Sequence, residues 1–192
     1  IQGHWAEKYI ERAAELGWIK GFEDGTFRPD TYITRAQAMT MIIRVLNRIP
    51  EDESDLLPGM NVWPDCNPGD WFYPYVTEMA EIGAVSGFTD GNFRPNATVS
   101  RLEAYTMALG MFPRESYSAD ELAKVEAVNG PDFWGNRTIA QSIYDELNMF
   151  GLSAEEWSKP ATRDELACLL GMSYAGYMLS LIHISEPTRR VV

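Results

Sequence analysis

The chain has 192 residues, 45% of them apolar and 12% aromatic, which is enough to bury a sizeable core as one compact unit or two. Its formal net charge of -12 argues against nucleic acid as a partner, because phosphate binding needs a basic face. Two cysteines, Cys66 and Cys168, are too few for a disulfide framework. Their apolar neighbours predict buried free thiols, and the redox compartment stays open.

The first stretch of the chain predicts two helices joined by a tight loop. Apolar residues at helical spacing between residues 5 and 16 form one face of a first helix, and Gly17 stands where a left-handed residue would end it. The loop 21–29 contains Asp24-Gly25, a strong signal for a structural turn. A second helix begins behind Thr34. Such a pair is too small to bury its own apolar faces, so copies of it must pack on one another.

The start of that second helix is marked by a motif that occurs three times. Thr34-Arg35-Ala36-Gln37 returns as residues 100–103 and, more loosely, as residues 162–165. A Ser or Thr followed three residues later by Gln or Glu is a capping box, so each copy starts a helix. Each box also places an arginine in the first turn, where the helix dipole disfavours a cation, and this favours a role in binding an anion. The arginines are Arg35, Arg101 and Arg163, and for each the alternative is an ordinary surface residue.

An interval of 66 residues organises the chain. Four pairs of residues keep it: Trp5 and Trp71, Gly21 and Gly87, Pro29 and Pro95, and Arg35 and Arg101. We therefore assign a first module to residues 1–48 and a second to residues 68–113. Residues 49–67, rich in proline and acidic side chains, are assigned to a linker.

A third, degenerate module is predicted at residues 133–178. Trp134 lies 29 residues before Arg163, against 30 in the other two modules, so the frame is kept. The Asp-Gly turn is missing, and residues 152–160 take its place. The linker before this module, residues 114–132, contains a further capping box that predicts a short helix from Ala119 to Val128.

The C-terminal residues 179–192 are set aside as a non-native tail. Residues 179–189 are similar to an in-frame translation of a sequencing adapter, and the other end has neither an initiator methionine nor a signal peptide, as expected for a piece of a longer protein. Residues 166–184 are uncharged and long enough to pass as a membrane span. Their first half belongs to the helix opened by the third box and their second half to the tail, so we expect no membrane span.

The ordered motifs resemble the S-layer homology (SLH) module of bacterial surface proteins. A Trp-led helix, the loop Gly-Phe-x-Asp-Gly-x-Phe-Arg-Pro and the Thr/Ser-Arg-x-Gln/Glu box follow one another in residues 3–48 and 68–113, and weakly in residues 133–172. The resemblance implies a mainly α fold in which three helix–loop–helix modules pack as a pseudo-threefold helical bundle. It also implies an extracellular location at the cell wall or S-layer surface.

The resemblance further implies non-covalent anchoring to the cell wall, with grooves between neighbouring modules binding a pyruvylated secondary cell-wall polysaccharide. Carried over to this chain, the ligand-binding residues are Trp5, Arg35, Trp71, Arg101 and Arg163. A guanidinium can grip the pyruvyl carboxylate, and an indole face suits a sugar ring. The alternative for both tryptophans is core packing.

Two departures from the family pattern bear on these grooves. Gln37 stands where the family usually has a glutamate, which keeps the cap and removes a charge. The third module lacks the turn that its groove would need. A second hypothesis gives the modules a structural role in self-assembly, with neighbouring S-layer subunits as partners. The identity of the wall polymer and of any further domain stays open.

The sequence predicts no catalytic, metal or cofactor site. Asp65, Asn67 and Asp70 weakly resemble a calcium loop, but Val76 stands where the bidentate glutamate is required. Two histidines are too few for a zinc set, and no nucleophile elbow or phosphate loop is present, so the chain is not expected to be an enzyme.

Four further residues near the loops have simpler expected roles. Trp18 and Trp63 are assigned to packing. Arg28 and Arg94, next to the turns, either brace the loop or line the groove, and the sequence does not decide between these roles.

Overall fold

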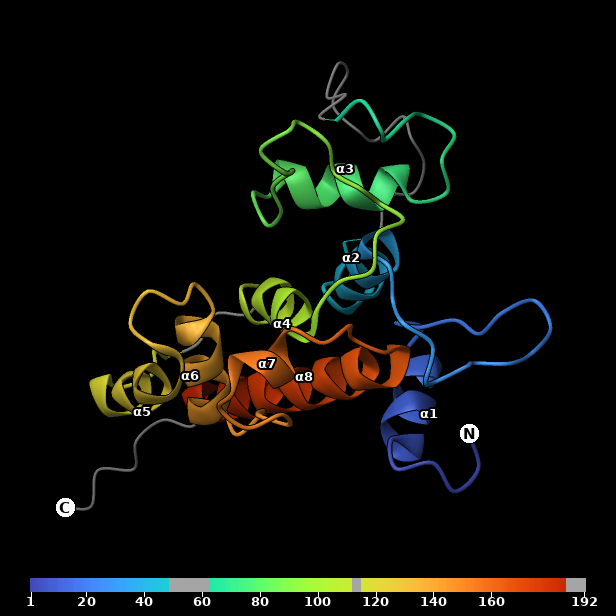
Figure 1. Cartoon of the computed structure of the whole chain (residues 1–192). Helices are drawn as coiled ribbons and strands as arrows, with labels where there is room; N and C mark the ends of the chain where they lie inside the picture. Colours follow the sequence, from blue (N-terminus) through green and yellow to red (C-terminus); the bar gives the residue numbers. More distant parts are fainter. Residues whose placement is uncertain (49–62, 112–114, 186–192) are drawn as a thin grey trace.

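The computed structural model describes residues 1–48, 63–111 and 115–185, with the backbone alone for residues 175–185. The protein is mainly helical, as predicted (Figure 1). In chain order the helices are α1 (Glu7–Glu15), α2 (Arg35–Val45), α3 (Tyr73–Glu81), α4 (Arg101–Leu109), α5 (Ala119–Asn129), α6 (Asn136–Tyr144), α7 (Ala154–Trp157) and α8 (Arg163–Ser185).

These helices follow the predicted order. The pairs α1 and α2, α3 and α4, and α6 and α8 are the two helices of each predicted module, and α5 is the predicted extra helix. The short helix α7 was not predicted, and it lies in the segment 152–160 that replaces the third Asp-Gly turn. Most of the predicted linker 49–67 lies outside the described residues, as do residues 186–192 of the predicted tail. The non-native origin of residues 179–192 stays a prediction.

The predicted capping boxes form at the starts of α2 and α4. In α2 the hydroxyl of Thr34 accepts from the N–H of Gln37 at 3.3 Å, and the side chain of Gln37 accepts from the N–H of Thr34 at 3.2 Å. Ser100 and Glu103 make the same reciprocal pair. At α8 the carboxylate of Glu165 accepts from the N–H of Thr162 at 3.0 Å. All three boxes therefore begin helices, as the spacing predicts.

The two Asp-Gly loops are structural turns, as predicted. The carboxylate of Asp24 accepts from the N–H of Thr26 at 3.0 Å, and Gly25 has a φ of +78°, a left-handed conformation that glycine adopts without a steric cost. Arg28 forms an ion pair with Asp24 at 2.6 Å and lies 4.2 Å from the ring centre of Phe22. The second loop repeats this arrangement, with Arg94 on Asp90 at 2.7 Å. Arg28 and Arg94 therefore brace their loops.

A closed ring of backbone hydrogen bonds joins the three predicted modules. The N–H of Ile33 donates to the carbonyl of Ala161 at 3.0 Å, Ala161 donates to Val99 at 2.9 Å, and Val99 donates to Ile33 at 3.2 Å. All three residues are buried. Each residue lies just before a capping box, so the ring fixes the starts of α2, α4 and α8 relative to one another.

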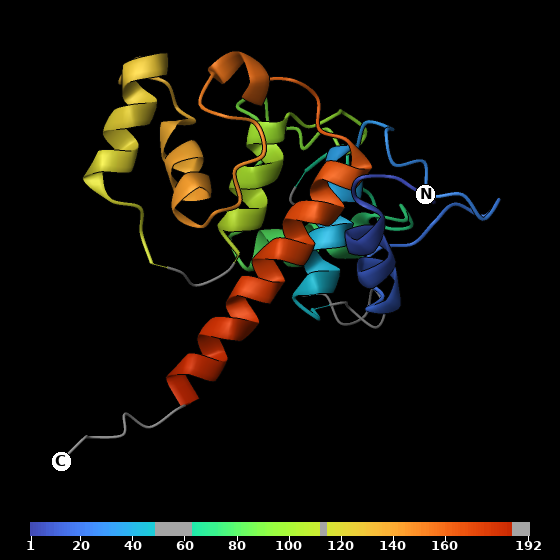
Figure 2. The ribbon, with the colours of Figure 1, turned by 90° about the horizontal axis from the view of Figure 1, so that it is seen from below.

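The helices pack in the same cyclic order as the three modules follow around this ring. The first helix of each module packs against the second helix of the preceding one: α3 against α2, α6 against α4, and α1 against α8. Helix α8 also contacts α2 and α4, and Figure 2 shows it running between the α5–α6 pair on one side and α1 and α2 on the other. The pseudo-threefold symmetry of the bundle stays a prediction.

The core contains the residues that were assigned to packing. Trp18 and Trp63 are 6% and 7% exposed. Cys66 and Cys168 are buried and free, and burial raises the pKa of their thiols to about 12 and about 11. Among the described helices, none combines the length and the apolar character needed to cross a bilayer.

Candidate functional site

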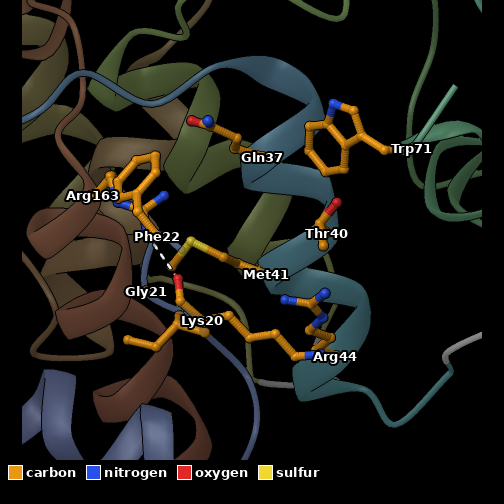
Figure 3. Close-up of a pocket in the computed structure, with 10 residues that line it drawn as sticks. Lys20, Gly21, Phe22, Gln37, Thr40, Met41, Arg44, Trp71 and Arg163 are labelled. Atoms are coloured by element: carbon orange, nitrogen blue, oxygen red, sulfur yellow. Dashed lines mark hydrogen bonds between the residues drawn. The ribbon is translucent and has the colours of Figure 1, made fainter. Parts of the chain in front are cut away.

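Two pockets of similar size lie where neighbouring modules meet. The first, which we call the first groove, has a volume of about 170 Å³ and the second groove about 180 Å³. Figure 3 shows that the first groove is bounded by α2, by the loop before Phe22 and by Trp71 of the next module. Its lining residues are Ile19, Lys20, Gly21, Phe22, Gln37, Thr40, Met41, Arg44, Trp71 and Arg163. The second groove is lined by Arg35, Ala84, Val85, Ser86, Glu103, Thr106, Met107 and Trp134.

The repeat builds the same pocket twice. Gln37, Thr40 and Met41 of the first groove correspond, 66 residues on, to Glu103, Thr106 and Met107 of the second. Each groove also receives a tryptophan from the start of the following module and an arginine from the start of another module's second helix. Each groove is thus assembled from three parts of the chain, which only the folded bundle brings together.

The arginine of each groove is bound to main-chain carbonyl groups. Arg163 donates from Nε to the carbonyl of Phe27 at 3.0 Å and from its terminal nitrogen to that of Lys20 at 3.1 Å. Its guanidinium lies 4.8 and 4.7 Å from the ring centres of Phe22 and Phe27. The side chain therefore clamps the loop of the first module to the start of α8.

Arg35 makes the same contacts with the second module. It donates to the carbonyls of Phe93 at 2.9 Å and Ser86 at 3.3 Å, and it stacks against Phe88 and Phe93. Arg35 and Arg163 are each 7% exposed, and burial lowers the pKa of both side chains. The sequence predicted an anion as the partner of these arginines. The structure shows hydrogen bonds to carbonyl oxygens, and each of the two arginines is also among the residues that line a groove.

Arg101 differs from the other two arginines because it meets carboxylates. Its Nη2 donates to the carboxylate of Glu165 at 2.6 Å, and its Nε donates to the same carboxylate at 3.1 Å. Its Nη1 donates to the carboxylate of Glu156 at 3.3 Å. Burial opposes the charge on Arg101, but the two carboxylates outweigh it, so the pKa of Arg101 rises. Its guanidinium also lies 4.1 Å from the ring centre of Phe150. Arg101 lines neither groove.

This cyclic arrangement changes which arginine is affected by the missing turn. The sequence places the lost turn in the third module, whose own arginine is Arg163, and associates it with that module's groove. In the structure Arg163 binds the intact loop of the first module, and Arg101 lies against the altered segment that contains α7. The physical reason is that each arginine reaches across the ring to the loop of another module.

Three tryptophans that begin the modules are on the surface. Trp5 and Trp71 are each 56% exposed and Trp134 is 61% exposed, so none of them packs in the core. Trp71 lines the first groove and Trp134 the second, while Trp5 lines neither. The sequence reasoning missed Trp134 as a groove residue, although its spacing before Arg163 was the signal that could have found it. It also missed Lys20 and Arg44, which carry no comparable signal.

One group among the described residues offers three ligand atoms to a metal ion. These atoms, from His4, Asp30 and Asp164, lie within 4.8 Å of one another. However, Nδ1 of His4 accepts from the N–H of Ala6 at 3.2 Å, so the neutral ring carries its proton on Nε2. Nε2 is the nitrogen that faces the carboxylates of Asp30 and Asp164, at 3.6 and 3.7 Å. Because Nδ1 already accepts a hydrogen bond, a metal on Nε2 would require the ring to lose its last N–H proton, so the geometry favours a contact that joins the start of the chain to α8.

We expect the two Asp-Gly loops to lose stability in acid below the usual range for aspartate. Hydrogen bonds from Thr26 and Arg28 lower the pKa of Asp24 to about 2, and Arg94 and the N–H of Asn92 do the same for Asp90. Because these pKa values are lower in the folded state, the stabilisation is present above pH 4 and is lost as the pH falls toward 2. Titration of the Thr26 and Asn92 amide signals by NMR measures this, and midpoints near 3.8 would contradict it.

Comparison with known proteins assigns the modules. Residues 1–39 and 64–104 match the family model of the S-layer homology domain. The chain therefore carries tandem S-layer homology modules. The predicted third module, residues 133–178, lies outside the two matched ranges and stays a prediction. S-layer homology modules are structural and binding units rather than enzymes, and they indicate a location at the cell surface.

Relatives of the chain are surface proteins of bacteria. It is 28% identical over 143 residues to the "Cellulosome-anchoring protein" of Acetivibrio thermocellus, covering 73% of this chain and 30% of that protein. It is 31% identical over 153 residues to the "Surface layer protein" of Brevibacillus choshinensis, covering 74% of this chain and 13% of that protein. A third relative, "Cell surface glycoprotein 1" of Acetivibrio thermocellus, is 32% identical over 109 residues, 54% of this chain and 5% of that protein. The chain thus spans less than a third of each of these relatives.

Proposed function

We propose that the S-layer homology modules of this chain anchor a bacterial surface protein to the cell wall by binding a pyruvylated secondary cell-wall polysaccharide in the grooves between modules. The observation that carries the proposal is that the repeat builds one kind of groove twice, each with an exposed tryptophan at its edge and a guanidinium within it. An exposed tryptophan at the same place in both grooves supports a binding role, because an indole offers a large flat apolar face and one N–H donor.

The chemistry of each groove suits an acidic sugar. A pyruvyl ketal presents a carboxylate held rigidly on the sugar ring, and a charged hydrogen bond to a guanidinium or ammonium stabilises such a complex by roughly 1.5–3 kcal/mol. The exposed indole faces of Trp71 and Trp134 offer flat apolar surfaces to the sugar. Two such grooves on one chain bind a repeating polymer more tightly than either groove alone, because the second contact is intramolecular.

A sedimentation assay with wall sacculi stripped of protein tests the proposal. We expect the full chain to pellet with untreated sacculi and to stay in the supernatant when mild acid has removed the pyruvyl ketals. Replacing both Trp71 and Trp134 by alanine should reduce pelleting at least about tenfold, because each indole face contributes about 1 kcal/mol or more. Arginine variants are less suitable here, since Arg35 and Arg163 clamp the loops.

The matched control is Tyr32→Ala, because Tyr32 is an aromatic residue that is 57% exposed and lines neither groove. This variant should pellet like the original chain. Pelleting that survives the acid treatment would contradict the pyruvyl assignment, and pelleting that survives both tryptophan substitutions would contradict the grooves as the site.

Assembly with neighbouring S-layer subunits is the second candidate function, favoured by the similarity to a surface layer protein. It predicts that the chain forms oligomers at rising concentration in the absence of any wall polymer. Sedimentation-velocity measurements on the chain alone separate the two functions, since the anchoring proposal needs no such oligomers.

A further inference from the structure

The two grooves are similar in size and share equivalent lining positions, but they differ in charge. The first groove contains three cationic side chains, Lys20, Arg44 and Arg163, and its lining includes no carboxylate. The second groove contains one cation, Arg35, and one carboxylate, Glu103. Figure 3 shows Lys20 and Arg44 on the same side of the first groove, with Gln37 further along α2.

Substitutions at three equivalent positions account for this difference. Lys20 corresponds to Ser86 and Arg44 to Gly110, 66 residues on, so the second groove lacks both cations. At the third position Gln37 corresponds to Glu103, and both residues are the last member of a capping box. Glutamine and glutamate fill that structural role equally well, so this position changes the charge of the groove without changing the start of the helix.

We infer that the first groove is the main anion site of the chain, and that the last residue of the capping box, Gln37 or Glu103, sets the preference of each groove for an anionic sugar. The inference rests on the proposed function and deepens it, because it assigns the acidic units of the polymer to one groove. Glu103 repels a ligand carboxylate and competes with it for the guanidinium of Arg35, whereas Gln37 does neither.

The third arginine, Arg101, shows what happens when carboxylates of the chain itself occupy the guanidinium. Arg101 is bound by Glu165 and Glu156, so its hydrogen-bond donors are directed at carboxylates of the chain itself. Glu165 is the box residue that corresponds to Gln37 and Glu103, and it is 12% exposed. Gln37 is neutral and lines a groove with Arg163, Glu103 lines a groove with Arg35, and Glu165 pairs directly with Arg101. We therefore expect the affinity for an anion to be highest at Arg163, lower at Arg35 and lowest at Arg101.

A reciprocal exchange of the box residues tests the inference. The variants are Gln37→Glu, Glu103→Gln and the double exchange, all of which keep a capping box. The full chain is labelled with 5-fluorotryptophan, and ¹⁹F NMR follows Trp71 and Trp134 as separate reporters of the two grooves, assigned with Trp71→Phe and Trp134→Phe. The probes are a methyl glycoside that carries a pyruvyl ketal and the same glycoside with a neutral isopropylidene ketal.

We expect the pyruvylated probe to bind the first groove about tenfold more tightly than the second, a difference that one nearby unit charge can produce. Gln37→Glu should weaken the first groove about threefold, Glu103→Gln should strengthen the second about threefold, and the double exchange should narrow the difference between them, because Lys20 and Arg44 stay in the first groove. The neutral probe should show no such dependence. Equal affinity of the pyruvylated probe for both grooves, unchanged by the exchange, would overturn the inference and leave the wall-polymer proposal standing. If neither probe binds in either groove, the wall-polymer proposal fails as well.

Discussion

Replacing Arg35 by alanine is expected to lower the free energy of unfolding by about 3 kcal/mol. The substitution leaves the buried carbonyl group of Phe93 without its donor, at about 1–3 kcal/mol, and also removes the partly buried hydrogen bond to Ser86 and a cation that lies against two phenylalanine rings. Arg35 is 7% exposed, so water does not replace these contacts without a rearrangement of the loop. Urea denaturation followed by tryptophan fluorescence measures the loss.

Arg12→Ala is the matched control for this prediction. Arg12 also forms an ion pair, with Glu15 at 3.1 Å, but both side chains are about two-thirds exposed, at 65% and 66%. Exposed pairs of this kind contribute about 0.5 kcal/mol or less, so this variant should unfold like the original chain. An Arg35→Ala variant that is as stable as Arg12→Ala would show that the clamp between modules has no energetic weight.

Asp65→Ala is expected to destabilise the loop of the second module by about 2 kcal/mol and to weaken the second groove. The two carboxylate oxygens of Asp65 accept from the N–H groups of Phe93 and Arg94 at 2.8 and 2.7 Å, and charged hydrogen bonds are the stronger kind. The carbonyl of Phe93 is in turn held by Arg35, so the loop, the arginine and the groove depend on one another. Hydrogen exchange at the Phe93 and Arg94 amides reports the loss directly.

The control for Asp65 is Asp70→Ala. The carboxylate of Asp70 accepts from the N–H of Asn67 at 2.8 Å in an exposed position, so its loss should have a smaller effect. Asp65→Ala should also leave ligand binding at Trp71 unchanged, because the first groove is built on the other loop. Faster exchange at Phe93 and Arg94 in Asp70→Ala but not in Asp65→Ala would contradict the assignment. Asp65 was noted in the sequence as part of a weak calcium-loop pattern, and the structure directs its carboxylate to the backbone instead.

The sequence by itself determined the local structure of this protein. The capping boxes, the Asp-Gly turns and a short helix from Ala119 to Val128, observed as Ala119–Asn129, were all predicted, because each depends on contacts within a few residues of the chain. The interval of 66 residues also predicted the module order. The short helix α7 was missed although Ser153, whose hydroxyl accepts from the N–H of Glu155, is a local signal for its start. Its end is also held by packing, with the indole N–H of Trp157 donating to the carbonyl of Gly151.

Only the tertiary structure decided how the candidate site is assembled. The sequence placed Arg35, Arg101 and Arg163 at equivalent positions and could not distinguish them. Folding gives Arg101 a different environment from Arg35 and Arg163, because the arginine of one module reaches the loop of another across the ring of Ile33, Val99 and Ala161. The hydrogen-bond partners of these arginines lie 51 to 143 residues away along the chain, so they depend on which modules become neighbours. The spacing of residues along the chain does not show which modules become neighbours, so the charge of each groove could be assigned only from the folded protein.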